Sequence, residues 1–174
     1  MKTLKKTFAI LLVGVIAFSC GNDDAPAATL TPTFDYFLKA KVDDVQFEAV
    51  APRVLAGKTA DRITISAILP DLRNFEITIS NYPANPVGTY VVPAPASSTY
   101  LANLKFSDNS SSSSIFTAGT ACGATGIRGT VIITAISATE ISGTFSFTGT
   151  QTSGACPRPT KVITEGSFKS GVTQ

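Results

Sequence analysis

The fold class is decided by a stretch near the C-terminus, Val131-Ile-Ile-Thr-Ala-Ile-Ser-Ala-Thr-Glu-Ile-Ser-Gly-Thr-Phe-Ser-Phe147. In its second half, apolar residues and Gly143 alternate with Ser and Thr, which is the period of a β-strand with one buried and one wet face. A turn at 138–140 pairs residues whose numbers add to 278, such as Val131 with Phe147 and Ala135 with Gly143. The stretch therefore predicts an antiparallel hairpin whose apolar side chains share one face.

The same period of two recurs from residue 34 onward, in short runs separated by Pro, Gly, Asp and Asn, and no window has a helical period. Runs on both sides of Asp43-Asp44 predict a hairpin that turns at these two residues. Ile115–Ala118 predicts a short edge strand, and Val162, Thr164, Gly166 and Phe168 predict the core face of the last strand. About ten such strands favour a single antiparallel β-sandwich, with a partly closed barrel as the alternative.

Residues 1–19 have the pattern of a secretory signal. Lys2, Lys5 and Lys6 precede an unbroken stretch of apolar residues and Gly from Phe8 to Phe18. A helix that spans a membrane needs about 20 apolar residues, so this stretch is too short to be one. A cationic start, a short apolar segment and small residues before Cys20 predict a cleaved signal peptide.

Cys20 decides the class of that signal. Ala17-Phe-Ser-Cys20 resembles a bacterial lipobox, and Gly21-Asn-Asp-Asp24 resembles the acidic tract of surface-exported Bacteroidota lipoproteins. We interpret Cys20 as the lipidated N-terminus of the mature chain, with a free or disulfide-bonded thiol as the alternative. Residues 20–33 are then the lipidated cysteine and a flexible tether, and 34–174 form one all-β domain. The expected location is the outer membrane, with the domain facing the cell exterior and the lipid as its membrane contact.

Charge excludes one class of partner. Three of the 14 Lys and Arg residues precede Cys20 and none of the 12 acidic residues does, so the chain from Cys20 on has 11 cationic and 12 acidic side chains and a net charge of −1. That segment contains no run of three Lys or Arg residues. We therefore expect no nucleic-acid partner.

The other two cysteines, Cys122 and Cys156, also add to 278, so the hairpin register places them opposite each other when it is extended past the strands. Exported chains usually oxidise such pairs. The predicted disulfide joins two loop-like segments, 119–128 and 149–159. A redox-active or nucleophilic thiol pair is the alternative, but the chain lacks a CxxC motif and any His.

The residues that usually carry catalysis are sparse. The absence of His excludes His-activated nucleophiles and His-containing zinc sites. The turn explains Asp43 and Asp44, and the glutamates lie at outward positions or strand ends, so no catalytic carboxylate pair is predicted. Asp108, Asn109 and the following serines could offer oxygens to calcium, but one carboxylate gives weak affinity and a solvated loop is favoured. We expect no enzyme, no metal site and no cofactor, with a carboxylate-dependent hydrolase as the less favoured alternative.

The remaining function is a non-catalytic binding or structural module with an unknown ligand or protein partner. A glycan-binding lipoprotein of a polysaccharide uptake system is the alternative. Aromatic rings often stack on sugars, and the chain has no Trp. The candidate ligand-binding aromatics are therefore Tyr82, Tyr90 and Tyr100, for which packing at strand edges is the competing interpretation.

Five segments together resemble one uncharacterised family of small lipoproteins from Flavobacterium-like bacteria. The similarity extends over most of residues 34–170, and its motifs are strand and turn signatures. It implies an all-β domain and carries no activity. The segments are Phe37-Leu-Lys-Ala-Lys-Val-Asp-Asp-Val-Gln-Phe47, Pro86-Val-Gly-Thr-Tyr90, Gly129-Thr-Val-Ile-Ile-Thr134, Ile141-Ser-Gly-Thr-Phe-Ser-Phe147 and Ile163-Thr-Glu-Gly-Ser-Phe168.

Overall fold

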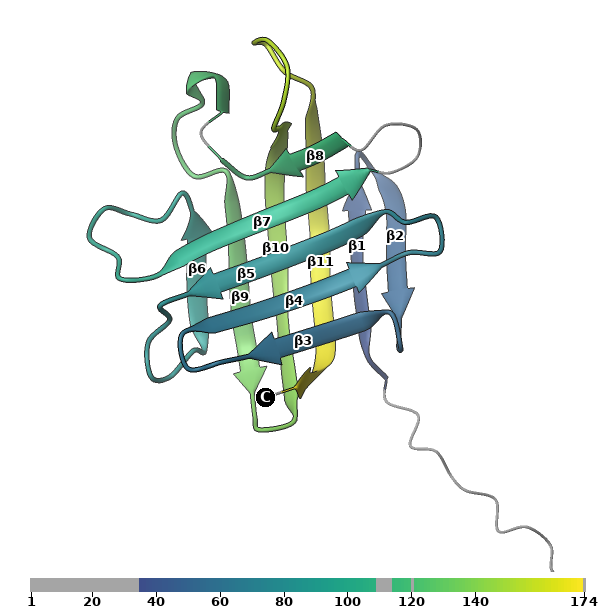
Figure 1. Cartoon of the computed structure of the whole chain (residues 1–174), viewed down its shortest axis with the longest axis vertical. Helices are drawn as coiled ribbons and strands as arrows, with labels where there is room; N and C mark the ends of the chain where they lie inside the picture. Colours follow the sequence, from purple (N-terminus) through teal and green to yellow (C-terminus); the bar gives the residue numbers. More distant parts are fainter. Residues whose placement is uncertain (1–34, 109–113, 120, 174) are drawn as a thin grey trace, which may run out of the picture. The chain divides into compact units, whose positions relative to one another are not determined.

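The computed structural model describes residues 35–108, 114–119 and 121–173, which form eleven strands and one short 3-10 helix (Figure 1). The predicted signal peptide (1–19), the lipidation site Cys20 and the tether lie outside the described residues. The elements are β1 (Phe37–Val42), β2 (Val45–Val50), β3 (Val54–Lys58), β4 (Arg62–Ile68), β5 (Asn74–Ser80), β6 (Gly88–Val92), β7 (Leu101–Asp108), β8 (Ser114–Thr117), η1 (Ala121–Gly123), β9 (Gly129–Ile136), β10 (Glu140–Gln151) and β11 (Thr160–Thr173).

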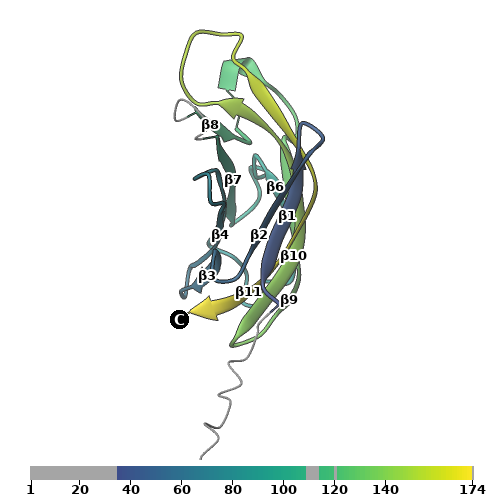
Figure 2. The same ribbon diagram turned by 90° about the vertical axis from the view of Figure 1, so that its right-hand side faces the viewer.

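The strands form two layers, as Figure 2 shows from the side. One layer contains β3, β4, β5, β7 and β8, and the other contains β2, β1, β11, β10, β9 and β6 in that order. The alternating apolar residues of both layers point toward each other and form one buried cluster that contains seven of the phenylalanines. The prediction of an all-β fold is confirmed.

Two contacts between the layers close part of the sheet into a ring. At one corner β8 pairs with the end of β10, and at the other the end of β11 pairs with β3 in parallel. The strand Ile115–Ala118 was expected at an edge, and this is wrong because β8 lies between β7 and β10. The fold thus combines a sandwich with partial barrel closure, and its one parallel pairing departs from the purely antiparallel expectation.

The predicted turn between β1 and β2 is present. Asp43 and Asp44 have φ values of 47° and 65°, as a two-residue hairpin turn of the primed type requires. The Asp43 carboxylate accepts a hydrogen bond from Val162 N at 2.9 Å and pairs with Lys161 at 2.8 Å. Partial burial raises the pKa of Asp43, but these two hydrogen bonds outweigh it and leave the pKa below its usual value. The turn therefore also holds the start of β11.

The register of the β9–β10 hairpin differs from the predicted one by two residues. Phe145 pairs with Val131, so the residue numbers add to 276. The turn is tighter than expected because Ser137 N donates to Glu140 O at 2.8 Å, which brings the two strands together earlier. The pairing then shifts by one residue at a bulge between Ser142 and Gly143, which changes the side chains of β9 that face the core. Ala135 is therefore exposed instead of facing the core.

A second bulge changes the last strand. Glu165 has a φ of 52°, and the pairing of β1 with β11 shifts beside it. As a result Ile163 is buried while Val162 is 48% exposed. Val162 and Thr164, which precede the bulge, were expected to face the core, and this is wrong. Phe168, which follows the bulge, faces the core as expected.

The sequence interpretation also missed β3, because this strand has only Val54 and Ala56 as buried alternating residues.

Gly143 provides a prediction about packing between neighbouring strands. A Cβ added there would collide with the carbonyl oxygen of Ile132 and lie 2.6 Å from the ring of Phe168. We expect Gly143→Ala to lower the free energy of unfolding by about 1–3 kcal/mol through overpacking. Urea denaturation measures this change. In the matched variant Gly57→Ala the new Cβ would meet nothing closer than 4.0 Å, so equal losses in both variants would contradict the argument.

Candidate functional site

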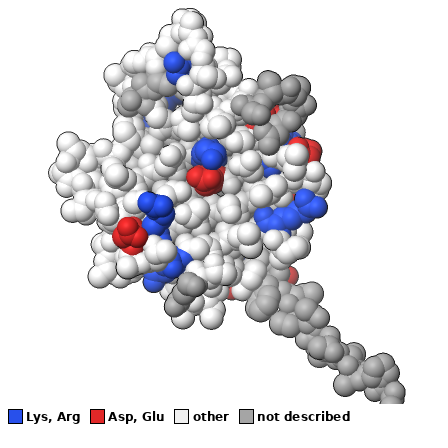
Figure 3. All heavy atoms as spheres, in the orientation of Figure 1, with Lys and Arg blue, Asp and Glu red and all other residues white. Residues whose placement is uncertain are grey.

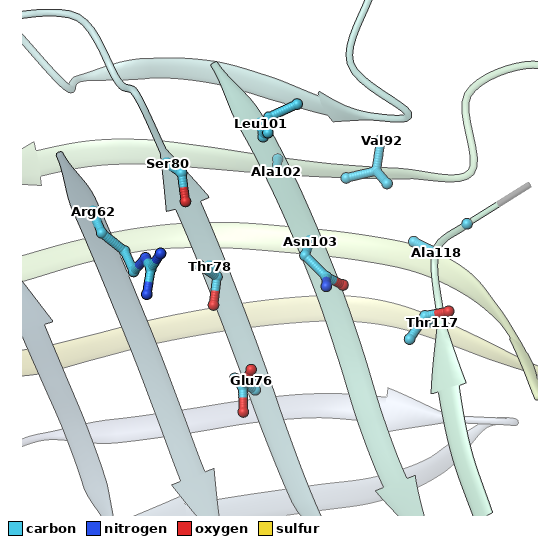
Figure 4. Close-up of a pocket in the computed structure, with 11 residues that line it drawn as sticks. Arg62, Glu76, Thr78, Ser80, Val92, Leu101, Ala102, Asn103, Thr117 and Ala118 are labelled. Carbon is cyan, nitrogen blue, oxygen red and sulfur yellow. The ribbon is translucent and has the colours of Figure 1, made fainter. Parts of the chain in front are cut away.

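A polar hollow of about 590 Å³ lies on the outer face of the first layer, over β4, β5 and β7 (Figure 4). Its polar side chains come from alternating positions that point away from the core, and three small or apolar residues border it where β8 ends and at the end of β6. The polar set is Arg62, Glu76, Thr78, Ser80, Asn103 and Thr117, and the bordering set is Val92, Ala118 and Gly119.

Strand register places these side chains in rows across the layer. Arg62 on β4 lies opposite Ser80 on β5, and Thr78 on β5 lies opposite Asn103 on β7. Glu76 lies opposite Lys105, which in turn faces Thr117 on β8. Neighbouring strands are about 4.8 Å apart, so the side chains within a row are within reach of one small ligand.

The hollow exists because β8 accompanies only the second half of β7. The pairing of the two strands ends at Lys105 and Thr117, and Ala118 N then donates to Leu104 O at 3.0 Å. Beyond that point the chain turns away toward η1, so the first residues of β7 have no strand on this side. The space left beside Leu101 and Ala102 opens the outer face into a depression.

Charge in the hollow is unevenly distributed. Lys105 Nζ lies 3.0 Å from Glu76 Oε2, and the two charges neutralise each other. Arg62 takes part in none of the ion pairs among the described residues. Its backbone N–H donates to Thr59 Oγ1, and its carbonyl oxygen accepts a hydrogen bond from Thr59 N at 2.8 Å. Figure 3 shows few charged side chains on this face. The hollow is therefore polar, with one cation that has no carboxylate partner in the described part of the chain.

These groups suit hydrogen bonding to a small polar ligand. Hydroxyls, a carboxamide and a guanidinium can donate, and the hydroxyls and the carboxamide can also accept. One carboxylate, Glu76, lies in the hollow, and it is paired with Lys105. Within the described ranges no group of three or more Cys, Asp or Glu side chains could hold a metal ion.

The candidate tyrosines do not line this hollow, and they pack in or against the core. Tyr90 is 3% exposed, its hydroxyl donates to Pro86 O at 2.7 Å, and burial raises its pKa. Tyr100 packs against it edge to face, with ring centroids 4.9 Å apart, and its hydroxyl accepts a hydrogen bond from Val91 N. Tyr82 is partly buried and donates to Thr59 O. The three rings do not form an exposed stacking platform.

The disulfide between Cys122 and Cys156 is present in the structure, with Cα atoms 5.6 Å apart. It joins the segment before β9 to the loop between β10 and β11, and Figure 1 shows both segments at the top of the domain. The hairpin register that predicted the pair is two residues off, and both cysteines lie beyond the ladder, Cys122 in η1 and Cys156 in the loop between β10 and β11.

Sequence reasoning missed the residues of the hollow. Arg62, Glu76 and Asn103 are recognisable as outward-facing positions of alternating strands. Alternation does not predict which outer face is hollowed, since that depends on where the pairing of β8 with β7 ends.

Among the described residues there is also no helix long and apolar enough to cross a membrane.

Fold and site together define a class: two-layered all-β domains with partial ring closure, a stapling disulfide and a polar hollow on one outer face. Within that class, the chain belongs to the family of the domain of unknown function DUF6252, whose model matches residues 35–171. No curated protein and no solved structure matches the chain.

Proposed function

We propose that this chain is a surface-exposed outer-membrane lipoprotein whose all-β domain is a non-catalytic binding module. The observation that carries the binding role is the polar hollow over β4, β5 and β7. Its volume of about 590 Å³ is within the range of small-molecule sites. Its polar side chains come from four strands, β4, β5, β7 and β8, which are packed on the core, and this favours recognition of one ligand shape.

The membrane location is supported by the N-terminal pattern. Lys2, Lys5 and Lys6, the apolar stretch after them and Cys20 fit a lipoprotein signal, and Asp23 and Asp24 fit surface export. A tether of about thirteen residues treated as a flexible coil reaches about 20 Å, enough to lift the domain clear of lipid headgroups. The lipid would hold the protein on the membrane without any spanning segment.

Replacing Cys20 tests the anchor. We expect the full chain to fractionate with membranes, and Cys20→Ser to move it to the soluble fraction. Mass spectrometry of the membrane-bound protein should find an N-terminal peptide that begins at a lipid-modified Cys20. The matched double variant Cys122→Ser, Cys156→Ser should stay with the membrane. An unmodified N-terminus upstream of Cys20 would contradict the anchor.

Glycan binding is the second candidate function, and the lining of the hollow favours it. Thr78, Ser80 and Asn103 lie in adjacent rows and present hydroxyl and amide groups to the same space. Sugars offer hydroxyl groups that both donate and accept, so this lining matches them. Binding would depend on hydrogen bonds rather than on ring stacking, since none of the candidate tyrosines lines the hollow.

An oligosaccharide array tests this function with the purified full-length chain. We expect binding to at least one oligosaccharide class, weakened roughly tenfold by Asn103→Ala because two or more hydrogen bonds are lost. Thr144→Ala removes an exposed polar side chain from the outer face of the other layer and should leave binding unchanged. No bound oligosaccharide, or equal losses in both variants, would count against the glycan ligand.

A further inference from the structure

The distribution of charge within the hollow points to the kind of ligand. Because Glu76 and Lys105 pair at 3.0 Å, the pair contributes little net charge. Arg62 lies at the other end and has no carboxylate partner among the described residues, and the adjacent Asp61 carboxylate accepts a hydrogen bond from Thr59 Oγ1 at 2.9 Å. Of the two charged side chains that line the hollow, Glu76 is therefore ion-paired, whereas Arg62, at the β4 side, forms no ion pair within the described ranges.

The spacing of the groups gives the ligand a direction. Arg62 lies opposite Ser80, and Glu76 lies four residues from Ser80 along β5. Four strand residues span about 13 Å, so the backbone positions of Arg62 and of the ion pair lie toward opposite ends of an elongated site, and the Arg62 side chain extends from its end toward Thr78 (Figure 4). Thr78 and Asn103 face each other between these ends and are uncharged. Figure 4 shows Arg62, Thr78 and Asn103 on three neighbouring strands of the same face.

We propose that the hollow takes an acidic oligosaccharide, whose carboxylate or sulfate group binds the Arg62 guanidinium while its hydroxyls bind Thr78 and Asn103. This inference rests on the proposed glycan-binding function and specifies its ligand. A guanidinium presents a planar pair of N–H donors that matches the oxygens of a carboxylate or sulfate. The uncharged middle of the site suits the hydroxyls of the sugar ring. The ion pair of Glu76 and Lys105 lies at the other end of the site, and because Lys105 is paired there, it is not a second free cation.

An acidic peptide is a less suitable ligand. A peptide chain would need backbone partners, and the part of β7 left unpaired by β8 is only a few residues long. The lining provides hydroxyl and amide side chains across three strands instead, which match a ligand with many hydroxyl groups. The observations therefore favour a saccharide over a peptide.

Isothermal titration calorimetry with matched probes tests the inference on the full-length chain. The probes are trigalacturonic acid, its fully methyl-esterified form, a sulfated galactan tetrasaccharide and triglutamate. We expect the free acid or the sulfated probe to bind roughly tenfold or more tightly than the neutral ester, the effect of one charge-assisted hydrogen bond. Whichever oxyanion binds more tightly identifies the acidic group, and raising the salt concentration should weaken that binding.

Two arginine variants serve as the internal comparison. Arg62→Gln should abolish the difference between acid and ester while the ester still binds. Arg53→Gln removes another exposed arginine that forms no ion pair in the described part of the chain, and it should leave all affinities unchanged. Equal thermal stability of the variants and the parent chain excludes a folding effect.

The outcomes separate this inference from the function on which it rests. If acid and ester bind equally and Asn103→Ala weakens both, the glycan-binding function stands and the acidic ligand is wrong. If none of these probes binds but the array shows another oligosaccharide, the acidic ligand alone is wrong, and if no saccharide binds in either experiment, both are wrong. If triglutamate binds through Arg62 and the saccharides do not, the site recognises acidic peptides, and the oligosaccharide is overturned.

Discussion

Phe75→Ala is expected to lower the free energy of unfolding by about 3–5 kcal/mol, which is the cost of removing a large ring from a packed core. Phe75 on β5 is fully buried. Its ring centroid lies 4.6 Å from that of Phe47 and 5.5 Å from that of Phe145, both in the other layer. A third ring, Phe106, lies 5.0 Å away in the same layer. Phe75 therefore connects the two layers, and its loss leaves a cavity that neither layer can fill alone.

Urea denaturation followed by circular dichroism measures this effect. Domains of this size are stable by about 5–15 kcal/mol, so the variant could lose a third of its stability or more. If Phe75→Ala does not fold, Phe75→Leu retains part of the side chain and should lose about 1–2 kcal/mol. Val45→Ala, at a position 62% exposed, is the matched control and should change stability by less than about 0.5 kcal/mol. A loss below about 1 kcal/mol for Phe75→Ala would contradict its central role.

Removal of the disulfide is expected to lower the free energy of unfolding by about 4 kcal/mol. Cys122 and Cys156 are 34 residues apart, and the loop-entropy model assigns a cost of this size to the freedom that the reduced unfolded chain regains. Both cysteines are exposed, so their replacement by serine removes little core packing. The stabilisation therefore comes from the unfolded state rather than from contacts in the folded domain.

The double variant Cys122→Ser, Cys156→Ser tests this value by urea denaturation without reductant. Reducing the parent chain should give the same loss, since both treatments open the same loop. The third cysteine supplies the control, because Cys20→Ser lies outside the domain and should leave the unfolding free energy unchanged. A difference below about 1 kcal/mol between the double variant and the parent chain would show that the loops are held by other contacts.

The proposed site depends on the same architecture. Its side chains lie on β4, β5 and β7, whose inner faces supply Ile65, Phe75 and Leu104 to the core. A variant that loosens this core would therefore also disturb the rows of polar groups on the outer face. Binding experiments with Arg62 and Asn103 variants should accordingly be compared at equal folded fraction.

Much of this domain could be predicted from local sequence. The alternation of apolar and polar residues predicted the all-β class and the core face of β10, because side chains along a strand point to opposite faces in turn. The Asp43-Asp44 turn was predicted from residues that tolerate a positive φ. The bridge between Cys122 and Cys156 followed from their positions in an exported chain, although the register used to pair them was inexact.

Only long-range contacts decided the rest. The bulges beside Gly143 and at Glu165 each insert one residue into a ladder, and this reverses which residues face the core, although the local alternation is unchanged. Ring closure by β8 and β3 depends on pairing between strand ends that are far apart in the sequence. In the sequence, outward-facing polar residues such as Arg62 and Asn103 look the same as those on any other strand. They form a site here because β8 leaves β7 halfway, and pairing between distant strands, not local sequence, determines that departure.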